Sequence, residues 1–372
     1  MKILYGVQGT GNGHITRARH LVNALASDPS LQVDYFFSGR KLKDYFDMEC
    51  FGNYLGKPGL TFHTTNGTIN YKKTLLNNNL IDFMKDVNAV DVGNYDLVLN
   101  DFEPITAWAS KLQGVPSISI SHQAALLHPI PNKKPNLLND FITRFFAPTS
   151  QTIGTHWYHF GYDVIPPFVA KELVEAAAGG RKKSLVDSIL VYLPFEELQV
   201  ISEHLVVLSE YQFICFHPLV ENAYVEENIA WYPPSTTQFK RHLISCDGVI
   251  CNAGFELSTE CLTLGKPLLI KPLRRQYEQM INANTLKMLG LAKVIHSIDS
   301  DAIQDWLLTR KSEIIGYSSD TRPLVNWLKS GNWNDTKELC DELWEQVIFP
   351  NDIKSQLNSR CINRRTAAPL QY

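Results

Sequence analysis

The chain has 372 residues, enough for two domains of ordinary size, and 44% of them are hydrophobic and 20% charged. This mixture excludes a chain that is disordered throughout. The near balance of 35 basic and 38 acidic residues excludes the strongly basic field typical of nucleic-acid-binding proteins. No apolar run approaches the roughly 18 to 20 residues of a membrane span. The seven cysteines include no C-x-x-C pair that would predict a zinc site. The apolar N-terminal stretch is too short for a signal peptide, so we expect a cytosolic protein.

The first 165 residues predict strands that alternate with helices. A strand over residues 2–7 is followed by a glycine loop and by apolar residues at helical spacing from Ile15 to Leu25. Further strands are predicted over 33–37, 95–99 and 117–121, with a helix over 105–112. Residues 53–79 are polar and aperiodic, which is typical of long loops that carry binding residues. This alternation indicates a parallel sheet covered on both faces.

A second pattern of the same kind begins at Ser188, after a segment rich in proline and glycine that marks a domain boundary. Strands are predicted over 188–192, 213–216, 248–251 and 268–270, and helices over 238–245, 255–264, 278–289, 302–309 and 336–347. The predicted architecture is therefore α/β, with two doubly wound Rossmann-like domains facing a cleft. We assign residues 1–165 to the first domain, 166–335 to the second, 336–349 to a helix packing back on the first, and 350–372 to a loose tail.

Gly9-Thr10-Gly11-Asn12-Gly13-His14 lies between a strand and a helix, where backbone N–H groups can approach an anion. The glycine spacing departs from the dinucleotide-binding pattern, because His14 occupies the third glycine position. Arg40 leaves a reductase open as an alternative, since an arginine there can hold a 2′-phosphate. His14 itself either caps or packs the helix, or acts as a base near neutral pH.

Asp101 ends one predicted strand and His122 follows another, so both are expected at the carboxyl edge of the first sheet. Asp101 can cap the next helix, and it can also orient an imidazole and stabilise its cation. His122 either lines an acceptor pocket together with Gly11, Asn12 and Gly13, or only packs.

The stretch from Cys246 to Ala283 predicts a second anion-binding helix start. A strand leads into Asn252-Ala253-Gly254, and a helix opens at Phe255 with the Ser258 and Thr259 hydroxyls nearby. Glu260 could reach a ribose diol from that helix, or it could be solvated surface. Glu278 and Gln279 open the next helix, where compensation of the helix dipole is the alternative to a binding role.

Taken together, these motifs resemble those of GT-B glycosyltransferases over roughly residues 1–345. The second half resembles the donor-binding box of UDP-dependent glycosyltransferases and of the peptidoglycan enzyme that adds N-acetylglucosamine to the undecaprenyl lipid. The glycine loop resembles the GGTGGH loop of that same enzyme. A poorly characterised group of prokaryotic GT-B-like glycosyltransferases shares both motifs.

The resemblance implies a role for each matching residue. His14 would be the base and Asp101 its partner. Backbone of Gly254, Phe255, Glu256 and Leu257 would bind phosphate, and Glu260 would bind ribose. Glu278 and Gln279 would bind the donor sugar, and Trp231 and Pro233 lie where the family holds its nucleobase. Asn252 replaces the family's commoner histidine or serine, so its side-chain contact with phosphate is left open.

We therefore expect an inverting transfer of sugar from a nucleotide diphosphate sugar, UDP-linked, to an acceptor hydroxyl, without metal or other cofactor. Asp299-Ser300-Asp301 is interpreted as a helix N-cap at Asp301 rather than a metal site. A sugar-nucleotide 2-epimerase and a non-catalytic nucleotide-sugar-binding protein are the alternatives. The acceptor stays open between a lipid-linked molecule and a glycan. The aromatic stretch from Phe141 to Phe146 either packs on the core or touches a membrane surface peripherally.

Overall fold

The computed structural model describes residues 1–60, 64–65, 68–69, 79–131, 133, 137–180 and 187–359. The chain divides into two compact units. The first comprises Met1–Thr61, Leu75–Phe168 and Tyr317–Tyr372, and the second Phe62–Thr74 and Val169–Gly316. The division after Phe168 lies near the expected boundary at 165. Residues 317–335, expected in the second domain, belong to the first unit.

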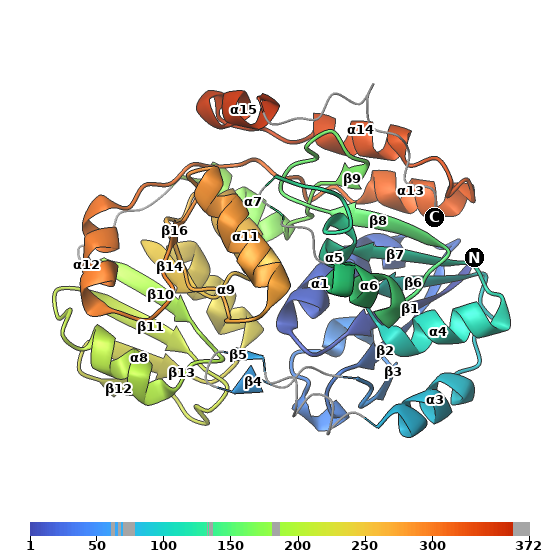
Figure 1. Cartoon of the computed structure of the whole chain (residues 1–372), viewed down its shortest axis with the longest axis horizontal. Coiled ribbons are helices and arrows are strands. Elements are labelled where there is room, and N and C mark those ends of the chain that lie inside the picture. Colours follow the sequence, from blue (N-terminus) through green and yellow to red (C-terminus); the bar gives the residue numbers. More distant parts are fainter. Residues whose placement is uncertain are drawn as a thin grey trace. The chain divides into compact units, whose positions relative to one another are not determined.

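The first unit contains a seven-stranded sheet in the order β3-β2-β1-β6-β7-β8-β9, and every pairing in it is parallel (Figure 1). Its strands are β1 (Lys2–Gln8), β2 (Gln32–Ser38), β3 (Tyr54–Lys57), β6 (Leu97–Asp101), β7 (Ser117–Ser121), β8 (Gln151–Thr155) and β9 (Val164–Ile165). The strand β3 corrects the expectation of loop from residue 53.

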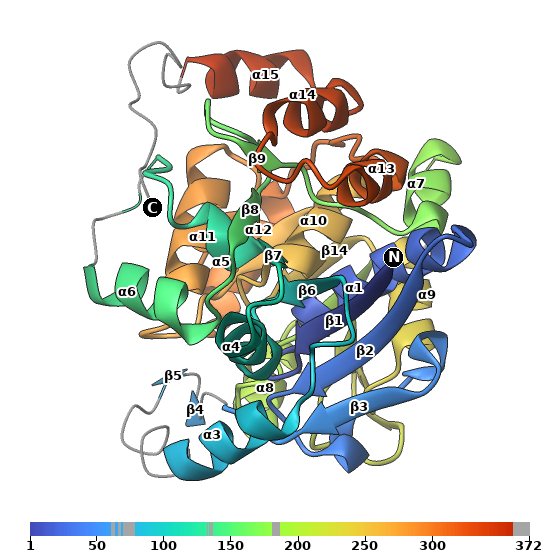
Figure 2. The same ribbon diagram turned by 90° about the vertical axis from the view of Figure 1, so that its right-hand side faces the viewer.

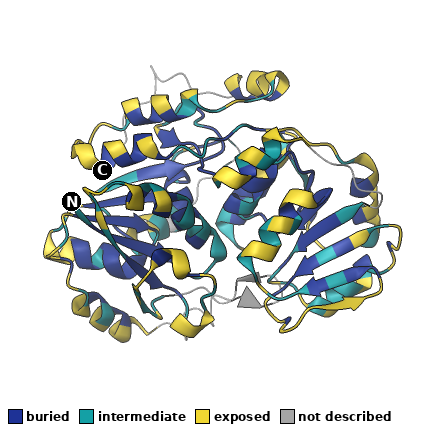
Figure 3. Ribbon diagram, turned by 180° about the vertical axis from the view of Figure 1, so that it is seen from behind, coloured by how far each residue is buried: buried dark blue, intermediate teal, exposed yellow. Residues whose placement is uncertain are grey.

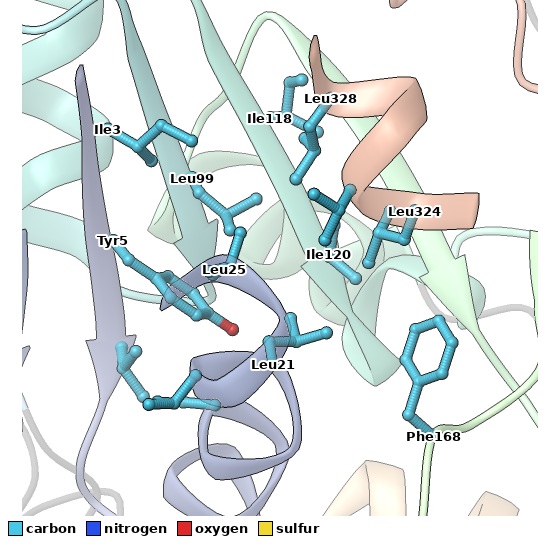
Figure 4. Close-up of a cluster of buried hydrophobic side chains, with 14 of the residues drawn as sticks. Ile3, Tyr5, Leu21, Leu25, Leu99, Ile118, Ile120, Phe168, Leu324 and Leu328 are labelled. Carbon is cyan, nitrogen blue, oxygen red and sulfur yellow. The ribbon is translucent and has the colours of Figure 1, made fainter. Parts of the chain in front are cut away.

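Alternate residues of these strands pack on opposite faces of the sheet. Ile3 and Tyr5 of β1 pack with Leu21 and Leu25 of α1 (Asn12–Ser27) (Figure 4). Leu4 lies in a separate cluster on the other side of the sheet. That second cluster includes residues of α3 (Leu80–Ala89) and α4 (Pro104–Gln113). The two-residue period of a strand therefore produces a sheet covered on both faces.

The C-terminal segment completes the first unit's core. Leu324 and Leu328 of α13 (Arg322–Ser330) join the cluster around β1 (Figure 4). Leu343 of α14 (Lys337–Glu345), the helix that follows α13 (Figure 2), belongs to the same cluster. Over the first part of the loose tail expected at 350–372, the structure instead has α15 (Asn351–Asn358), with Ile353 and Leu357 buried. Residues 360–372 of that expected tail lie outside the described residues. Two further helices, α5 (His122–Ala125) and α6 (Leu137–Phe146), follow β7.

The second unit has its own seven-stranded sheet, in the order β12-β13-β11-β10-β14-β15-β16, and only β12 runs antiparallel to its neighbour among these pairings. The strands are β10 (Ser188–Tyr192), β11 (Gln212–Phe216), β12 (Tyr224–Glu226), β13 (Ile229–Tyr232), β14 (Gly248–Cys251), β15 (Leu268–Ile270) and β16 (Lys293–Val294). A separate antiparallel pair consists of β4 (Thr64–Thr65) and β5 (Thr68–Ile69).

The helices of the second unit are α7 (Lys171–Ala178), α8 (Leu198–Leu205), α9 (Thr236–Ser245), α10 (Phe255–Thr263), α11 (Tyr277–Met288) and α12 (Ser300–Thr309). Buried residues concentrate on the strands and on the inward faces of the helices (Figure 3). The N-cap of α12 is Asp299, whose side chain accepts a hydrogen bond from the Ala302 N–H, and not Asp301 as expected. None of the helices in the described ranges combines the length and the apolarity needed to cross a bilayer.

Candidate active site

The candidate site of the first unit lies at the carboxyl ends of three adjacent strands. Strands β1, β6 and β7 are neighbours and parallel, and they end at Gln8, Asp101 and Ser121. The segments that follow them, which carry His14, Phe102 and Gln123, therefore lie at one edge of the sheet. Ligands bind at this edge in open parallel sheets.

The glycine loop after β1 is held by Arg40. The Arg40 Nε donates to the Gly9 carbonyl, and Nη2 donates to the Asn12 Oδ1 at 3.0 Å. Arg40 thus holds the glycine loop in place. This use of its side chain argues against the reductase alternative, in which Arg40 would hold a 2′-phosphate. Gly11 is the N-cap of α1, and a Cβ at this position would meet no described atom within 4 Å. Gly11, Asn12 and Gly13 are half-buried, so open space adjoins the helix start.

His14 and Asp101 are in direct contact, as the sequence predicts. The His14 Nδ1 lies 2.7 Å from the Asp101 Oδ1, and the Asp101 side chain is completely buried, whereas 13% of the His14 side chain is exposed. A carboxylate only accepts hydrogen bonds, so Nδ1 carries the proton. The lone pair then lies on Nε2, which faces the Gln123 side-chain amide at 3.5 Å.

The turn that follows Asp101 is fastened by Asn100. Its Nδ2 donates to the Glu103 carbonyl at 2.7 Å, and its Oδ1 accepts from the Glu103 N–H at 3.0 Å. Between them Phe102 adopts a positive φ of 56°, which costs energy for a bulky residue. Its ring stacks on His14, with centroids 6.3 Å apart.

Glu103, and not Asp101, caps the next helix. Its carboxylate accepts from the Ile105 N–H at 2.8 Å and from the Thr106 N–H at 2.6 Å, and the Ser38 and Thr106 hydroxyls also donate to it. Burial raises the pKa of Glu103, against the effect of these hydrogen bonds. Because Glu103 takes the capping role, the Asp101 carboxylate is available to His14.

His122 is a packing residue, which corrects the alternative of an acceptor contact. It is fully buried, its Nδ1 lies 2.9 Å from the Thr155 carbonyl, and its ring packs against His156. The next residue, Gln123, approaches His14 instead. No sequence signal singles out Gln123, because its position depends on how α5 begins after β7.

In the second unit, α10 begins at a glycine, as α1 does in the first unit. Gly254 is the N-cap, and a Cβ built there would meet no described atom within 4 Å. Since glycine has no side chain to cap the helix, this end can accept an anionic ligand. Phe255 and Glu256 are buried and Leu257 is half-buried, so any contact there involves the backbone. Ser258 is fully buried inside the helix, which argues against the expected contact between its hydroxyl and phosphate.

Asn252 stabilises the loop between β14 and α10. Its Nδ2 donates to the Lys271 carbonyl at 2.8 Å, which leaves the Oδ1 as a buried acceptor with no partner among the described residues. The Oδ1 cannot bind phosphate because it only accepts hydrogen bonds, so a contact between this side chain and phosphate would have to use the second Nδ2 proton. Asn282 adds a second brace, because its Nδ2 donates to the Ala253 carbonyl at 3.0 Å.

Glu260 lies close to Glu256 on α10, and only 8% of it is exposed. Burial is the largest cause that raises the pKa of Glu260 to about 8, the Glu256 carboxyl adds to it, and Lys240 acts in the opposite direction. No described residue donates a hydrogen bond to this carboxyl group. It is therefore a buried acid that a ligand hydroxyl could satisfy, rather than solvated surface.

The other predicted donor-site residues differ from one another. Gln279 is buried, and its Oε1 accepts from the Leu273 N–H at 2.9 Å, so this oxygen serves the loop before α11. Glu278 is half-buried and lies near the Gln276 amide.

Trp231 is a core residue of β13 and only 1% exposed, and its Nε1 donates a hydrogen bond to Glu226. This burial corrects the predicted contact between Trp231 and the nucleobase. Pro233, after the strand, is half-buried.

Two buried ionic groups were not anticipated from the sequence. Arg17 lies on α1 and donates to the Asp101 Oδ1 at 3.0 Å. Lys271, at the end of β15, pairs with Glu196 beyond the end of β10. Because β14 separates β10 and β15, this pair crosses the carboxyl edge beside the Asn252 loop.

In the parts of the chain that the structure describes, no group of three or more His, Cys, Asp or Glu side chains could hold a metal.

The model of glycosyl transferase family 1 matches residues 1–310. The chain therefore belongs to glycosyl transferase family 1, and it is a glycosyltransferase. No curated protein sequence matches it.

Solved glycosyltransferases share the fold over 96% of this chain. Streptomyces sp. SF2575 SsfS6, complexed with thymidine diphosphate, has 13% identity and a TM-score of 0.56, covering 96% of this chain and 98% of that one. Phytolacca americana UGT2, complexed with UDP-2fluoro-glucose and pterostilbene, has 10% identity, a TM-score of 0.56 and the same 96% and 98% coverage. Acinetobacter baumannii MurG has 16% identity, a TM-score of 0.50 and coverage of 96% and 98%. The predicted GT-B fold is confirmed.

Replacing Glu260 by glutamine is expected to remove a pH dependence of stability. The usual carboxyl pKa of 4.5 rises to about 8 on folding, so the folded state holds a proton that the unfolded state releases between these values. Stability from this group is complete below pH 4.5 and is lost as the pH rises toward about 8. Urea unfolding at pH 5, 6.5 and 8 should show a smaller loss for Glu260→Gln than for the wild type. The exposed Glu203→Gln is the control, and parallel losses in all three proteins would contradict the assignment.

Proposed function

We propose that the protein transfers a sugar, with inversion, from a UDP-linked donor to an acceptor hydroxyl. The observation that carries this proposal is the contact between His14 and the buried Asp101 at the carboxyl edge of the first sheet. A non-catalytic binding protein would have no use for such a base, and a sugar-nucleotide 2-epimerase would turn over nucleotide sugar without any acceptor.

In this mechanism His14 is the general base. Its Nε2 takes the proton of the acceptor hydroxyl, and Asp101 stabilises the imidazolium through Nδ1. The acceptor oxygen then bonds to the anomeric carbon as the bond from that carbon to the leaving diphosphate breaks. Attack opposite to the leaving group inverts the anomeric centre. The Gln123 amide near Nε2 marks the side from which the hydroxyl would approach.

The donor would bind to the second unit. The start of α10 at Gly254 would receive the diphosphate, whose charge a helix N-terminus favours. Glu260 would accept hydrogen bonds from the ribose, and Glu278 would contact the sugar. Solved relatives with the same fold bind thymidine diphosphate and UDP-2fluoro-glucose, both pyrimidine nucleotides, which supports a pyrimidine donor. In this proposal the helix start replaces a metal as the counter-charge.

The acceptor would be a lipid-linked molecule or a glycan. Phe141 and Phe145 of α6 are 57% and 47% exposed and lie against each other, with ring centroids 4.3 Å apart. These exposures argue against packing of this face on the core and favour the lipid-linked acceptor.

Glu260→Ala is expected to weaken UDP binding by about 1 to 3 kcal/mol, because the ribose hydroxyl loses a buried hydrogen-bonding partner. Isothermal calorimetry with EDTA present measures this, with Glu203→Ala as the matched control and thymidine diphosphate as the second ligand. Equal affinity of the wild type and Glu260→Ala for UDP would contradict the ribose contact. Binding that appears only after magnesium or manganese is added would contradict metal independence.

His14→Ala is expected to lower turnover by about 10² to 10⁴, with donor affinity nearly unchanged. Asp101→Asn should cost less, since the imidazole stays, and the double variant should resemble His14→Ala because the two residues act as one unit. Steady-state rates with calorimetric donor affinities test this, with the exposed His296→Ala as the control. Normal turnover of His14→Ala would place the base elsewhere, and independent multiplication of the two losses would contradict the pair.

A further inference from the structure

Arg17 contacts the same carboxylate oxygen as His14. The two residues are three positions apart on α1, so they share a face of the helix. The Arg17 Nη1 lies 3.0 Å from the Asp101 Oδ1, and the His14 Nδ1 lies 2.7 Å from that same atom. Only 5% of Arg17 is exposed, so this cation is buried with its partner.

Charge balance explains why Asp101 needs a cation. The Asp101 side chain has no exposed surface, and its Oδ2 accepts no hydrogen bond within the described ranges. A buried carboxylate supported by one neutral imidazole is unfavourable, because burial removes the water that would stabilise its charge. A guanidinium stays charged at all relevant pH values, so Arg17 supplies the missing positive charge.

We propose that Arg17 is a positioning residue that pairs with the buried Asp101 carboxylate and holds it directed at His14. An ionised Asp101 accepts from Nδ1 and so holds the imidazole in the tautomer whose Nε2 can receive the acceptor proton. The other described neighbours of His14 are the Gln123 amide on α5 and the Phe102 ring after β6, and neither carries a charge. Asp101 and Arg17 are therefore the charged groups that control the tautomer. Arg17 itself exchanges no proton with the substrate.

This inference deepens the proposed function and rests on it for its catalytic consequence. Arg17→Met should lower kcat by about 10²-fold, the scale of a misplaced catalytic group, with donor affinity unchanged. Adding Arg17→Met to Asp101→Asn should cause little further loss, because both changes remove the same ionised acceptor. Arg17→Lys should restore part of the rate.

Nitrogen-15 NMR of His14 tests the inference without any acceptor or turnover. In the wild type the proton should reside on Nδ1, and in Arg17→Met it should redistribute toward Nε2. Arg19→Met is the matched control on the same helix, because Arg19 donates to the carbonyls of Phe46 and Asp47 and not to Asp101. Its spectrum should equal that of the wild type.

The outcomes separate the two claims. If Arg17→Met keeps the wild-type tautomer, the inference is wrong whatever the activity. If the tautomer changes but His14→Ala still turns over normally, the proposed function fails while the role of Arg17 toward Asp101 stands. If Arg17→Met does not fold, Arg17→Gln, which keeps a donor but has no charge, carries the same test and the same expectation.

Discussion

The hydrogen-bonded turn between β6 and α4 is the constraint on which the site in the first unit depends. Asn100 bonds to both backbone groups of Glu103, and Glu103 caps α4 with a fully buried carboxylate. These contacts hold Phe102 at its positive φ, and they place Asp101 beneath His14. The hydrogen bonds of this turn thus offset the cost of one unfavourable backbone conformation, which is typical of functional sites.

Both units use the same physical principle at different places in the chain. A parallel sheet gathers the ends of its strands at one edge, and a helix that starts at a glycine follows a central strand, at Gly11 in one unit and at Gly254 in the other. The charges differ, however. In the first unit the buried carboxylate is matched by Arg17, whereas Glu260 in the second has no matching cation within hydrogen-bonding distance among the described residues and has a raised pKa. In the proposed function, the paired Asp101 carboxylate supports a base in the first unit, and the unpaired Glu260 carboxyl can bind ligand hydroxyls in the second.

The contact between His14 and Asp101 could be predicted because it needs only two facts, that each residue follows a strand and that the strands are parallel. Arg17 could not, since an arginine on an amphipathic helix is typical of solvated surface. The predicted nucleobase contact of Trp231 is wrong because β13 alternates buried and half-buried residues, and this alternation turns the Trp231 side chain inward. The sequence does not predict that residues 317–345 belong to the first unit. Their place there depends on contacts with strands about 300 residues earlier, such as the packing of Leu324 and Leu328 on the core around Ile3.

The central claim is a single displacement at the anomeric carbon that His14 promotes, and it can be tested before the acceptor is known. Water replaces the acceptor when the protein is incubated with a UDP-sugar of α configuration that it binds. Proton NMR then follows the anomeric signal of the released sugar, before mutarotation mixes the two forms. We predict that the β-anomer appears first and that His14→Ala releases it far more slowly. Initial release of the α-anomer would show retention and would contradict the account.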